Sequence, residues 1–489
     1  MRSRFALPTF LQSLLIVGAI AGVAAAAAPI DVGDRKQLFI DDRFIAERDG
    51  IELRVNPPQK LGLLRDDDGK PYSGHIARVI DEGGKARLYL GHEHVQLLES
   101  EDGLTFHRTE VKLPGGQFPT IFLDPHESDP AKRYKLFDLE FSEPFDPSRH
   151  GVYASYSADG INFTRVGRVL PFFTDNPTVV HWDARINKYI IYTRAFDYDS
   201  ENQRRVGRIE TDDPLKPWPY TKTDEDRLFP SINNIPVVYS ADAGDDRHSD
   251  VYYNAAGPYP WADDVYLMFP THFRHFSRER NPFIRPPVKD QWEDFGMLEV
   301  QLAVSRDGVT WSRPSRQAYI PDGLPDEWDR WYTVAAPGLV RRGNYIYQYY
   351  YSSGRLHDSA ALRPEYEHSA KQEGGVGVVR QRLDGYVSAD ADHRGGSFRT
   401  PPIRFEGTRL RLNIDTGSAG TAFIEIQDAN GKPIPGFTMA DCEEIGGNFI
   451  DQCAYWKTNP DVSSLSGKPI RLAFKMKRAK LYAFQFSKG

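Results

Sequence analysis

The chain has 489 residues, a formal net charge of −7 at pH 7 and only two cysteines. Because affinity for a phosphate backbone comes mainly from lysine and arginine, this acidic balance argues against a nucleic-acid partner. Aromatic residues make up 12% of the chain, with 25 tyrosines, and glycine and proline are both plentiful. Such a composition is typical of a strand-rich protein with many turns.

Residues 1–28 have the pattern of a secretory signal peptide. Arg2 and Arg4 precede an apolar run over residues 11–23, which ends in small residues before Pro29. The run is short for a membrane span, so an uncleaved anchor is the alternative interpretation. We expect an exported protein, periplasmic or extracellular, without a membrane span after signal cleavage.

A tyrosine-led apolar strand recurs five times in residues 29–390, at 88–90, 134–136, 189–191, 265–267 and 345–347. In three of these repeats a later strand runs into a turn of the form Ser-x-Asp-Gly-x-Thr/Asn-aromatic, at residues 100–106, 157–163 and 305–311. An internal repeat of about 45 to 80 residues built from short strands indicates blades around an axis. Four strands per repeat predict a five-bladed β-propeller over residues 29–390.

The repeated turn orients the predicted propeller. Its aspartate can accept backbone N–H groups, its glycine can take a positive φ, and its aromatic residue can pack between blades, so we expect a structural role. The motif resembles the Asp-box of sialidases and other propeller hydrolases. Such turns lie on one face of a propeller, whereas the inner strands begin on the other. We therefore expect functional residues opposite the Asp-Gly turns.

The last hundred residues lack the tyrosine repeat. Strands of alternating polarity at 409–414, 423–426, 470–474 and 481–486 predict an antiparallel β-sandwich over residues 391–489. Both cysteines, Cys442 and Cys453, fall in this part of the chain. An exported chain permits cysteines to pair, so we expect a disulfide, with two buried free thiols as the alternative.

Several short segments carry a resemblance to a known enzyme group. They are Leu-Phe-Ile-Asp-Asp at 38–42, Asp-Asn at 175–176, His-Trp-Asp at 181–183, Tyr-Thr-Arg at 192–194, Phe-Pro at 269–270, and the segments 300–308, 382–385, 405–407 and 428–436. With them the chain resembles the glycoside hydrolase clan of families 32 and 43, which implies a five-bladed propeller followed by a sandwich. The nucleophile and acid motifs of invertases and fructanases are absent, which argues against fructan cleavage.

Glycoside hydrolysis uses two carboxyl groups that flank the scissile bond. Asp175 and Asp250 precede the inner strands of the third and fourth repeats, which places them near the axial funnel. Asp42 resembles by position the early aspartate that serves this clan as base or nucleophile, and Glu299 is our candidate acid. The alternative for each aspartate is a loop cap or an ion pair with arginine. The reserve candidates are Glu93 and Glu140.

Basic side chains in the same loops are candidate ligands for sugar hydroxyl or carboxylate groups. They are His92, Arg194, His272, Arg274 and Arg355. A surface ion pair is the alternative for each, and three converging arginines would indicate an acidic sugar. The histidine pairs at 92 and 94 and at 272 and 275 lack a third ligand, so we expect no metal cofactor, with a structural Ca²⁺ in the funnel as the open alternative.

These observations predict an exported glycoside hydrolase that cleaves a poly- or oligosaccharide with paired carboxylates in the propeller funnel. Its expected partner is the carbohydrate substrate alone. A non-catalytic carbohydrate-binding propeller is one alternative, because a fold does not fix a function. A sialidase-like hydrolase of acidic sugars is another, with a nucleophilic tyrosine supplied by Tyr332 or by residues 349–351.

Overall fold

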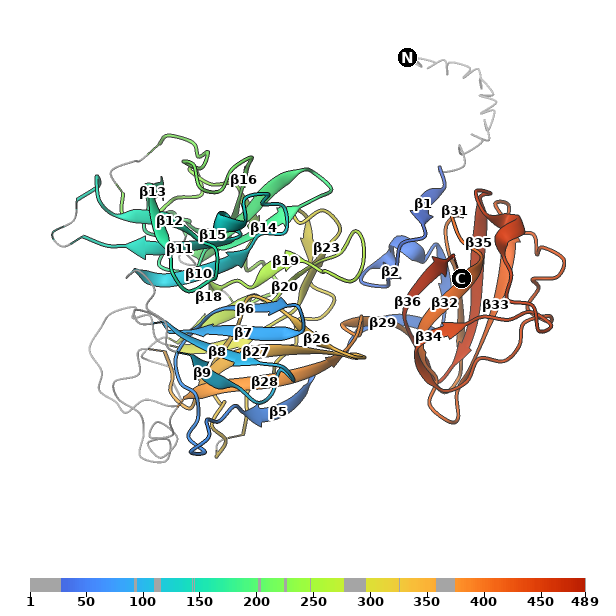
Figure 1. The fold of residues 1–489 in the computed structure, drawn as a ribbon. Coiled ribbons are helices and arrows are strands. Elements are labelled where there is room, and N and C mark those ends of the chain that lie inside the picture. The colour runs from blue at the N-terminus through green and yellow to red at the C-terminus, as the bar shows by residue number, and fades with distance from the viewer. Residues whose placement is uncertain are drawn as a thin grey trace, which may run out of the picture.

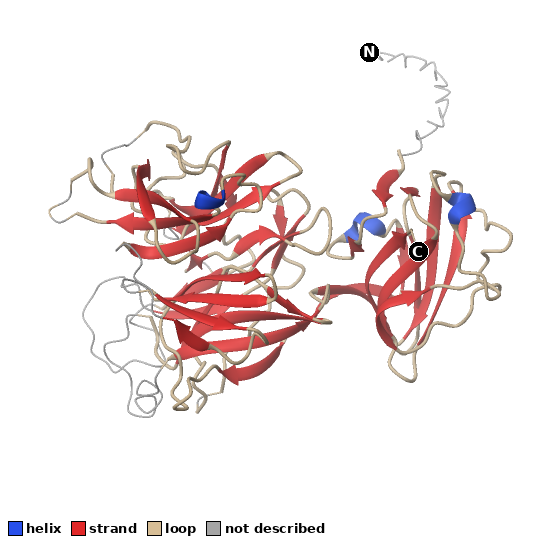
Figure 2. Cartoon of the chain, in the orientation of Figure 1, coloured by secondary structure: helices blue, strands red, loops and turns tan. Residues whose placement is uncertain are grey.

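The computed structural model describes residues 28–91, 95–109, 116–142, 144, 146–200, 204–223, 227–246, 248–276, 296–324, 326–357 and 374–488. Over these residues the chain is all-β, and its strands form two bodies joined near β4 and β29 (Figures 1 and 2). Its short 3-10 helices are η1 (Asp42–Phe44), η2 (Pro130–Lys132) and η4 (Ser463–Leu465). No helix among the described residues is long and apolar enough to cross a membrane.

The first three repeats each form a separate four-stranded antiparallel sheet whose strands follow chain order. This meander is the pattern of propeller blades. Their strands are β6 (Ile76–Glu82), β7 (Lys85–Leu90), β8 (Gln96–Ser100) and β9 (His107–Thr109), then β10 (Gln117–Leu123), β11 (Tyr134–Glu140), β12 (Gly151–Ser157) and β13 (Thr164–Leu170), then β14 (Val179–Asp183), β15 (Lys188–Phe196), β16 (Arg204–Thr211) and β17 (Val237–Tyr239).

The last two repeats are connected by a parallel bridge between Leu298 and Tyr332. In the fourth repeat each of three strands is interrupted, which gives β18 (Ser249–Tyr253) and β19 (Ala256–Pro258), β20 (Tyr266–Met268) and β21 (Thr271–His275), β22 (Gly296–Val300) and β23 (Ala303–Ser305), followed by β24 (Trp311–Ser312). The fifth contains β25 (Tyr332–Ala335), β26 (Val340–Arg342), β27 (Tyr345–Ser353) and β28 (Gly375–Arg382). Its outer strand is β5 (Gln59–Leu63), which pairs antiparallel with β28. An N-terminal strand therefore completes the last repeat.

The repeated turns and the repeated tyrosines bind each other across neighbouring sheets. In each turn the aspartate carboxylate accepts two backbone N–H groups, and Ser100, Ser157 or Ser305 accepts a third from the glycine. Tyr349, Tyr89 and Tyr192 each donate a hydroxyl hydrogen bond to the turn glycine's carbonyl of the next sheet, at 2.7, 3.2 and 2.8 Å. The motif is structural, as its chemistry predicts. We call the end of the sheets with these turns the turn face and the opposite end the loop face.

The second body is a pair of six-stranded sheets. One contains β1 (Ile30–Gly33), β3 (Glu47–Asp49), β30 (Gly396–Arg399), β31 (Ile403–Phe405), β33 (Thr421–Asp428) and β35 (Ile470–Lys477). The other contains β2 (Gln37–Leu38), β4 (Ile51–Val55), β29 (Val387–Ala391), β32 (Arg409–Asp415), β34 (Asn448–Cys453) and β36 (Ala479–Ser487). Strands from both ends of the chain thus build the sandwich. This pairing differs from the expected division at residue 390, because residues 30–55 join the sandwich and not the repeats.

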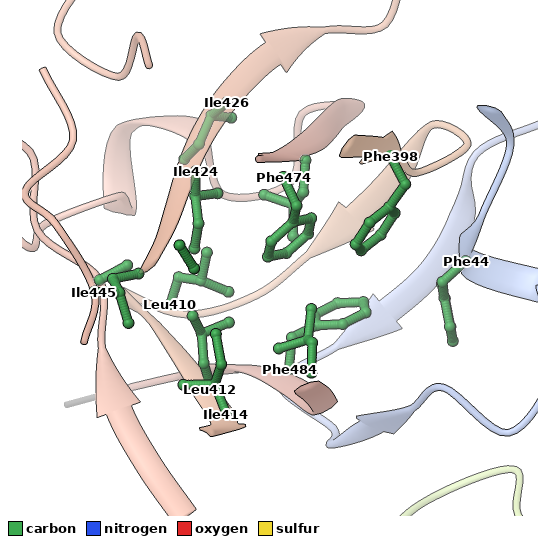
Figure 3. Close-up of a cluster of buried hydrophobic side chains, with 14 of the residues drawn as sticks. Phe44, Phe398, Leu410, Leu412, Ile414, Ile424, Ile426, Ile445, Phe474 and Phe484 are labelled. Atoms are coloured by element: carbon green, nitrogen blue, oxygen red, sulfur yellow. The ribbon is translucent and has the colours of Figure 1, made fainter. Parts of the chain in front are cut away.

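The two sandwich sheets enclose one apolar core (Figure 3). Phe398 stacks on Phe474 at 4.6 Å between ring centroids, and Phe44 meets Phe484 edge-on at 5.2 Å. The expected disulfide is wrong, because Cys442 and Cys453 are separate buried thiols. Cys442 belongs to the apolar core, where its Sγ accepts from the Ile424 amide, whereas Cys453 ends β34 opposite Arg411.

Candidate active site

Asp175 lies on the loop face, directly before the inner strand β14. Its backbone has a φ of 49°, a left-handed conformation that is uncommon outside glycine and often occurs at functional sites. Its carboxylate accepts a 2.6 Å hydrogen bond from Nη1 of buried Arg194, near the end of β15. The Asp175 side chain itself is 38% exposed. Asp175 thus presents an arginine-bound carboxylate to solvent.

Asp250 lies on the inner strand β18 and is buried, with 2% of its side chain exposed. Its Oδ2 accepts from Nη1 of Arg204 at 3.1 Å, and its Oδ1 lies 3.3 Å from Nε2 of His275. Burial raises the pKa of this carboxyl group, but His275 and Arg204 lower it by more, so its pKa lies below the ordinary range. Asp250 is therefore an ionised group at neutral pH.

Tyr252 connects these two carboxylate sites. The guanidinium carbon of Arg194 lies 5.2 Å from the centroid of its ring, and that of Arg204 lies 5.6 Å from it. Arg194 and Asn176 both donate to its backbone carbonyl. Asp175 and Asp250, which precede or open successive inner strands, therefore belong to one contiguous cluster.

Aromatic side chains extend this cluster toward the fifth repeat. The Tyr252 hydroxyl is 3.4 Å from that of Tyr332 and 3.1 Å from Nε2 of His357. The Tyr332 ring lies parallel to His357 and edge-on to Tyr351, with 5.8 and 5.9 Å between centroids. Such rings provide faces on which a sugar can stack.

The tyrosines of the cluster lack the properties of a nucleophile. Burial raises the pKa of Tyr252, and it raises that of Tyr332 well above the ordinary value. Arg194 and Arg204 are nearly buried, and each already binds an aspartate. This arrangement argues against the sialidase-like alternative, which needs an activated tyrosine and arginines available to an acidic sugar.

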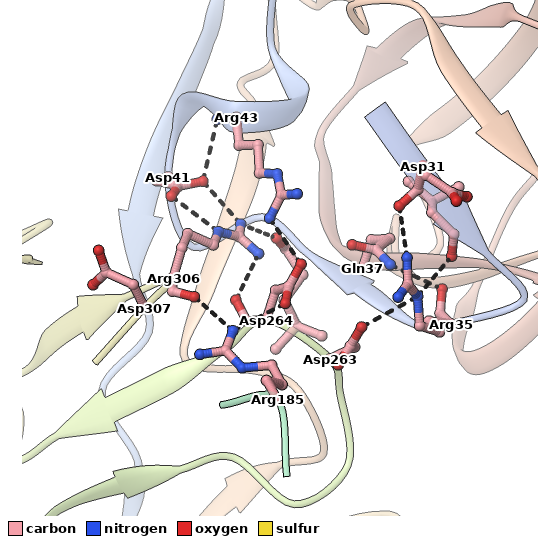
Figure 4. A network of polar contacts seen from close by, with 12 residues as sticks. Asp31, Arg35, Gln37, Asp41, Arg43, Arg185, Asp263, Asp264, Arg306 and Asp307 are labelled. Atoms are coloured by element: carbon pink, nitrogen blue, oxygen red, sulfur yellow. Dashed lines mark hydrogen bonds and ion pairs between the residues drawn. The ribbon is translucent and has the colours of Figure 1, made fainter. Parts of the chain in front are cut away.

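The structure places Asp42 away from this cluster, contrary to the expectation from its sequence position. It begins η1, pairs at 2.6 Å with Arg48 and is 60% exposed. The neighbouring Asp41 binds Arg306, which belongs to a turn-face turn (Figure 4). The reason is the pairing of residues 30–55 with the sandwich, which holds Asp42 on the turn-face side.

Glu299 lies on β22, the third strand of the fourth repeat, as its sequence position predicted. It lies opposite His272 in the register of β21 and β22, and its carboxylate accepts from Gln301 at 2.7 Å. Asp250 lies opposite Phe273, one position along. Within the described parts of the chain, no hydrogen bond or ion pair joins Glu299 to the cluster.

Of the candidate basic ligands, some lie in or near the cluster and others lie away from it. Arg194 is part of the cluster. Arg355 is near it, because burial raises the pKa of Tyr351 and the charge of Arg355 partly opposes that rise. Arg274 is exposed and pairs with Asp246. His272 is buried between sheets, where it binds the Tyr239 hydroxyl at 2.8 Å and burial lowers its pKa to about 4. His92 and Glu93 lie outside the described residues.

Three cluster members were not predicted from the sequence, namely Arg204, Tyr252 and His357, whereas His275 was already noted there as the partner of His272 in a histidine pair. The sequence did contain a signal for Tyr252. Because side chains alternate along a strand, residues 250 and 252 are expected on the same side of the sheet. Arg204 and His357 approach from other sheets, which no local pattern reveals. Asp138, on β11, was included only as the start of a charged loop, yet burial raises the pKa of its carboxyl group to about 7.

No protein-family model and no curated protein sequence matches the chain. Solved structures similar in strand arrangement include an exo-β-1,3-galactanase from Phanerochaete chrysosporium, with 10% identity, a TM-score of 0.37 and coverage of 88% of this chain and 99% of that one. An N-acetylgalactosamine deacetylase from F. plautii has 11% identity, a TM-score of 0.41 and coverage of 68% and 96%. A family 117 glycoside hydrolase from Zobellia galactanivorans has 14% identity, a TM-score of 0.36 and coverage of 67% and 90%.

Proposed function

We propose that the protein is an exported glycoside hydrolase of poly- or oligosaccharides, with a five-bladed propeller whose loop face carries the active site. The observation that supports this proposal most is the contiguous cluster of Asp175, Arg194, Tyr252, Arg204 and Asp250. It combines two carboxylates with aromatic faces, the residue types that glycoside hydrolysis uses.

In this proposal the two aspartates have different tasks. Asp175 is accessible and acts as the reacting carboxylate, either as the nucleophile or as the base that activates water. Asp250 is buried and acts as a positioning residue that holds Arg204 and His275 in place.

The reaction also needs a proton donor, and we assign this task to Asp138. Its side chain is fully buried, so the assignment includes a rearrangement on substrate binding that exposes this carboxyl group. Its pKa of about 7 leaves much of the carboxyl group protonated at neutral pH, as a general acid requires. Its carboxyl group lies close to Gly116, next to the inner strand β10, one sheet before Asp175. Nη2 of Arg165 is 2.6 Å from its Oδ2 and fixes the side chain.

The test is an assay of the mature protein against a panel of poly- and oligosaccharides. Asp175→Asn is expected to lower kcat/KM at least about 100-fold on any glycan that the wild type cleaves, because it removes the reacting carboxylate. Asp246→Asn is the matched control, since Asp246 pairs with exposed Arg274 outside the cluster. Full turnover by Asp175→Asn would rule out this site.

The assignment of Asp138 has its own readout. If Asp138 is the acid, the alkaline limb of the kcat/KM profile has its midpoint near pH 7, and Asp138→Asn removes that limb together with most of the activity. A glycan that binds wild type but is never cleaved would favour the non-catalytic binding propeller.

A further inference from the structure

The axis of the repeats ends on the turn face in a cavity of about 1110 Å³. The ends of β6, β10 and β14 line it, together with the segment 255–269. Its walls include the aromatic residues Phe122, Trp182, Tyr259, Trp261 and Tyr266. Pockets for small organic ligands have about this volume and this kind of lining. The cavity therefore has room for a ligand at the end of the axis opposite Asp175.

Arg78, on the inner strand β6, is a buried member of this lining. Among the residues that the structure describes, its Nε and Nη1 atoms have no hydrogen-bond partner, and its Nη2 lies 3.4 Å from Nδ1 of His181. Nε2 of His181 is 2.9 Å from the Ala256 carbonyl, which can only accept, so Nε2 carries the proton and Nδ1 accepts from Arg78. Burial lowers the pKa of His181 well below its ordinary value, and the charge of Arg78 lowers it further. His181 is thus neutral and does not compensate the arginine.

The remaining charges around the cavity are compensated. Every other charged residue of the lining has an ion pair within the described part of the chain: Asp81, Asp124, Glu127, Arg133, Asp183, Arg185, Asp263 and Asp264. Figure 4 shows several of these pairs at the junction with the N-terminal segment. Arg78 has none. A buried cation without an anion is costly, which indicates that its partner is a ligand.

We propose that this cavity binds a carboxylate, which compensates the buried charge of the Arg78 guanidinium group. Arginine is a common partner of carboxylates in proteins, because its planar guanidinium group offers several charged N–H donors. The carboxylate belongs either to a small free acid or to an acidic sugar, whose ring the aromatic walls accommodate. The site is separate from the loop-face cluster, so it stands independently of the proposed hydrolase activity.

The test measures the melting temperature of the mature protein in chloride-free buffer with acetate, glucuronate, glucose or chloride. Acetate or glucuronate is expected to raise Tm saturably, because a ligand that binds only the folded state stabilises it, and glucose is expected to have no effect. A larger effect of glucuronate identifies an acidic sugar, and equal effects identify a free small acid. No rise with either carboxylate, or a rise with chloride alone, would overturn the proposal.

Three variants assign the effect to Arg78. Arg78→Met is expected to weaken carboxylate binding at least about tenfold, since it removes a desolvated charge pair. Arg78→Lys keeps the charge without the planar fork, so intermediate affinity is expected, and it serves if Arg78→Met does not fold. Arg133→Gln alters an arginine of the same lining that already pairs with Glu82 and should bind like wild type. A wild-type response from Arg78→Met would refute the assignment.

Discussion

The buried arginines at the two ends of the propeller axis differ in whether they have an acidic partner. On the loop face two buried arginines each bind an aspartate, Arg194 with Asp175 and Arg204 with Asp250. On the turn face Arg78 is also buried, but within the described part of the chain it pairs with no carboxylate, whereas every other charged residue of the cavity lining has an ion pair. The charges of the loop-face arginines are compensated within the protein, which holds these side chains in fixed positions. The charge of Arg78 is compensated only when an anion binds from outside, as expected of a binding site.

The largest expected effect is a difference in the free energy of unfolding between two variants, each of which removes one buried charge from one end of the axis. Asp250→Ala should lower the free energy of unfolding by about 3 to 5 kcal/mol, because it breaks a buried ion pair. Arg78→Met, without ligand, should cause no loss of stability, since it removes a buried charge that has no protein partner. Chemical denaturation of both variants measures the difference. An equal loss in the two variants would show that Arg78 is structural.

A second comparison uses pH. Burial raises the pKa of Asp138 on the loop-face end of β11 to about 7, so the folded state binds a proton that the unfolded state releases. The Asp138 carboxyl group therefore makes the free energy of unfolding decrease as pH rises from about 4 to 7. Asp138→Asn should remove this pH dependence. Denaturation midpoints at several pH values measure it. An unchanged slope in the variant would contradict the buried state of Asp138.

The turn face should respond in a lower pH range. Backbone hydrogen bonds from residues 104 and 105 oppose the effect of burial and lower the pKa of Asp102 to about 2. Its stabilising contribution is complete above pH 4 and is lost as pH falls toward 2. Asp102→Asn should therefore weaken the acid dependence below pH 4 and leave the range from pH 4 to 7 unaltered. A change in the higher range would contradict this separation.

The tyrosine contacts between sheets give a smaller effect. Tyr192→Phe and Tyr349→Phe should each lower the free energy of unfolding by about 1 kcal/mol, because each removes one buried hydrogen bond to a turn glycine. The two contacts lie far apart around the ring, so their effects should add. Tyr345→Phe is the control, since that side chain is exposed. A comparable loss in the control would show that the effect does not come from the buried hydrogen bonds to the turn glycines.

The smallest expected effect concerns the sandwich. Because Cys442 and Cys453 are free thiols, reductant should leave the melting temperature unchanged. Both thiols are buried, so alkylation should require unfolding. Melting curves with and without reductant, and mass spectrometry after alkylation, measure this. A lowered Tm under reductant would show that a disulfide forms.

The sequence predicted the parts of the fold that repeat locally. Ser-x-Asp-Gly turns and tyrosine-led strands mark each unit, because their hydrogen bonds depend on residues two or three positions apart. The same pattern directed the search to the loop face, where Asp175, Asp250 and Arg194 belong to one cluster. Local chemistry and strand order were sufficient for these.

The features that the sequence did not predict all depend on contacts between residues that are far apart in the sequence. Asp42 was misplaced because nothing in its neighbours shows that residues 30–55 pair with strands more than 300 positions away. Glu299 lies on the expected strand, but its register opposite His272, one position from the Phe273 that faces Asp250, cannot be read from its neighbours in the sequence. The isolation of Arg78 was equally invisible, since a missing partner is a property of the whole lining.

The sharing of strands between the chain ends has a consequence for folding during synthesis. The first of these strands to be synthesised, β1 to β4, find their partners only in β29 to β31 and β36, near the end of the chain. Contacts of such large sequence separation form late and slow a folding reaction. Residues 30–55 must therefore wait unpaired until synthesis of the chain is complete. A protein shortened at its C-terminus would expose these strand edges, which are sites of aggregation.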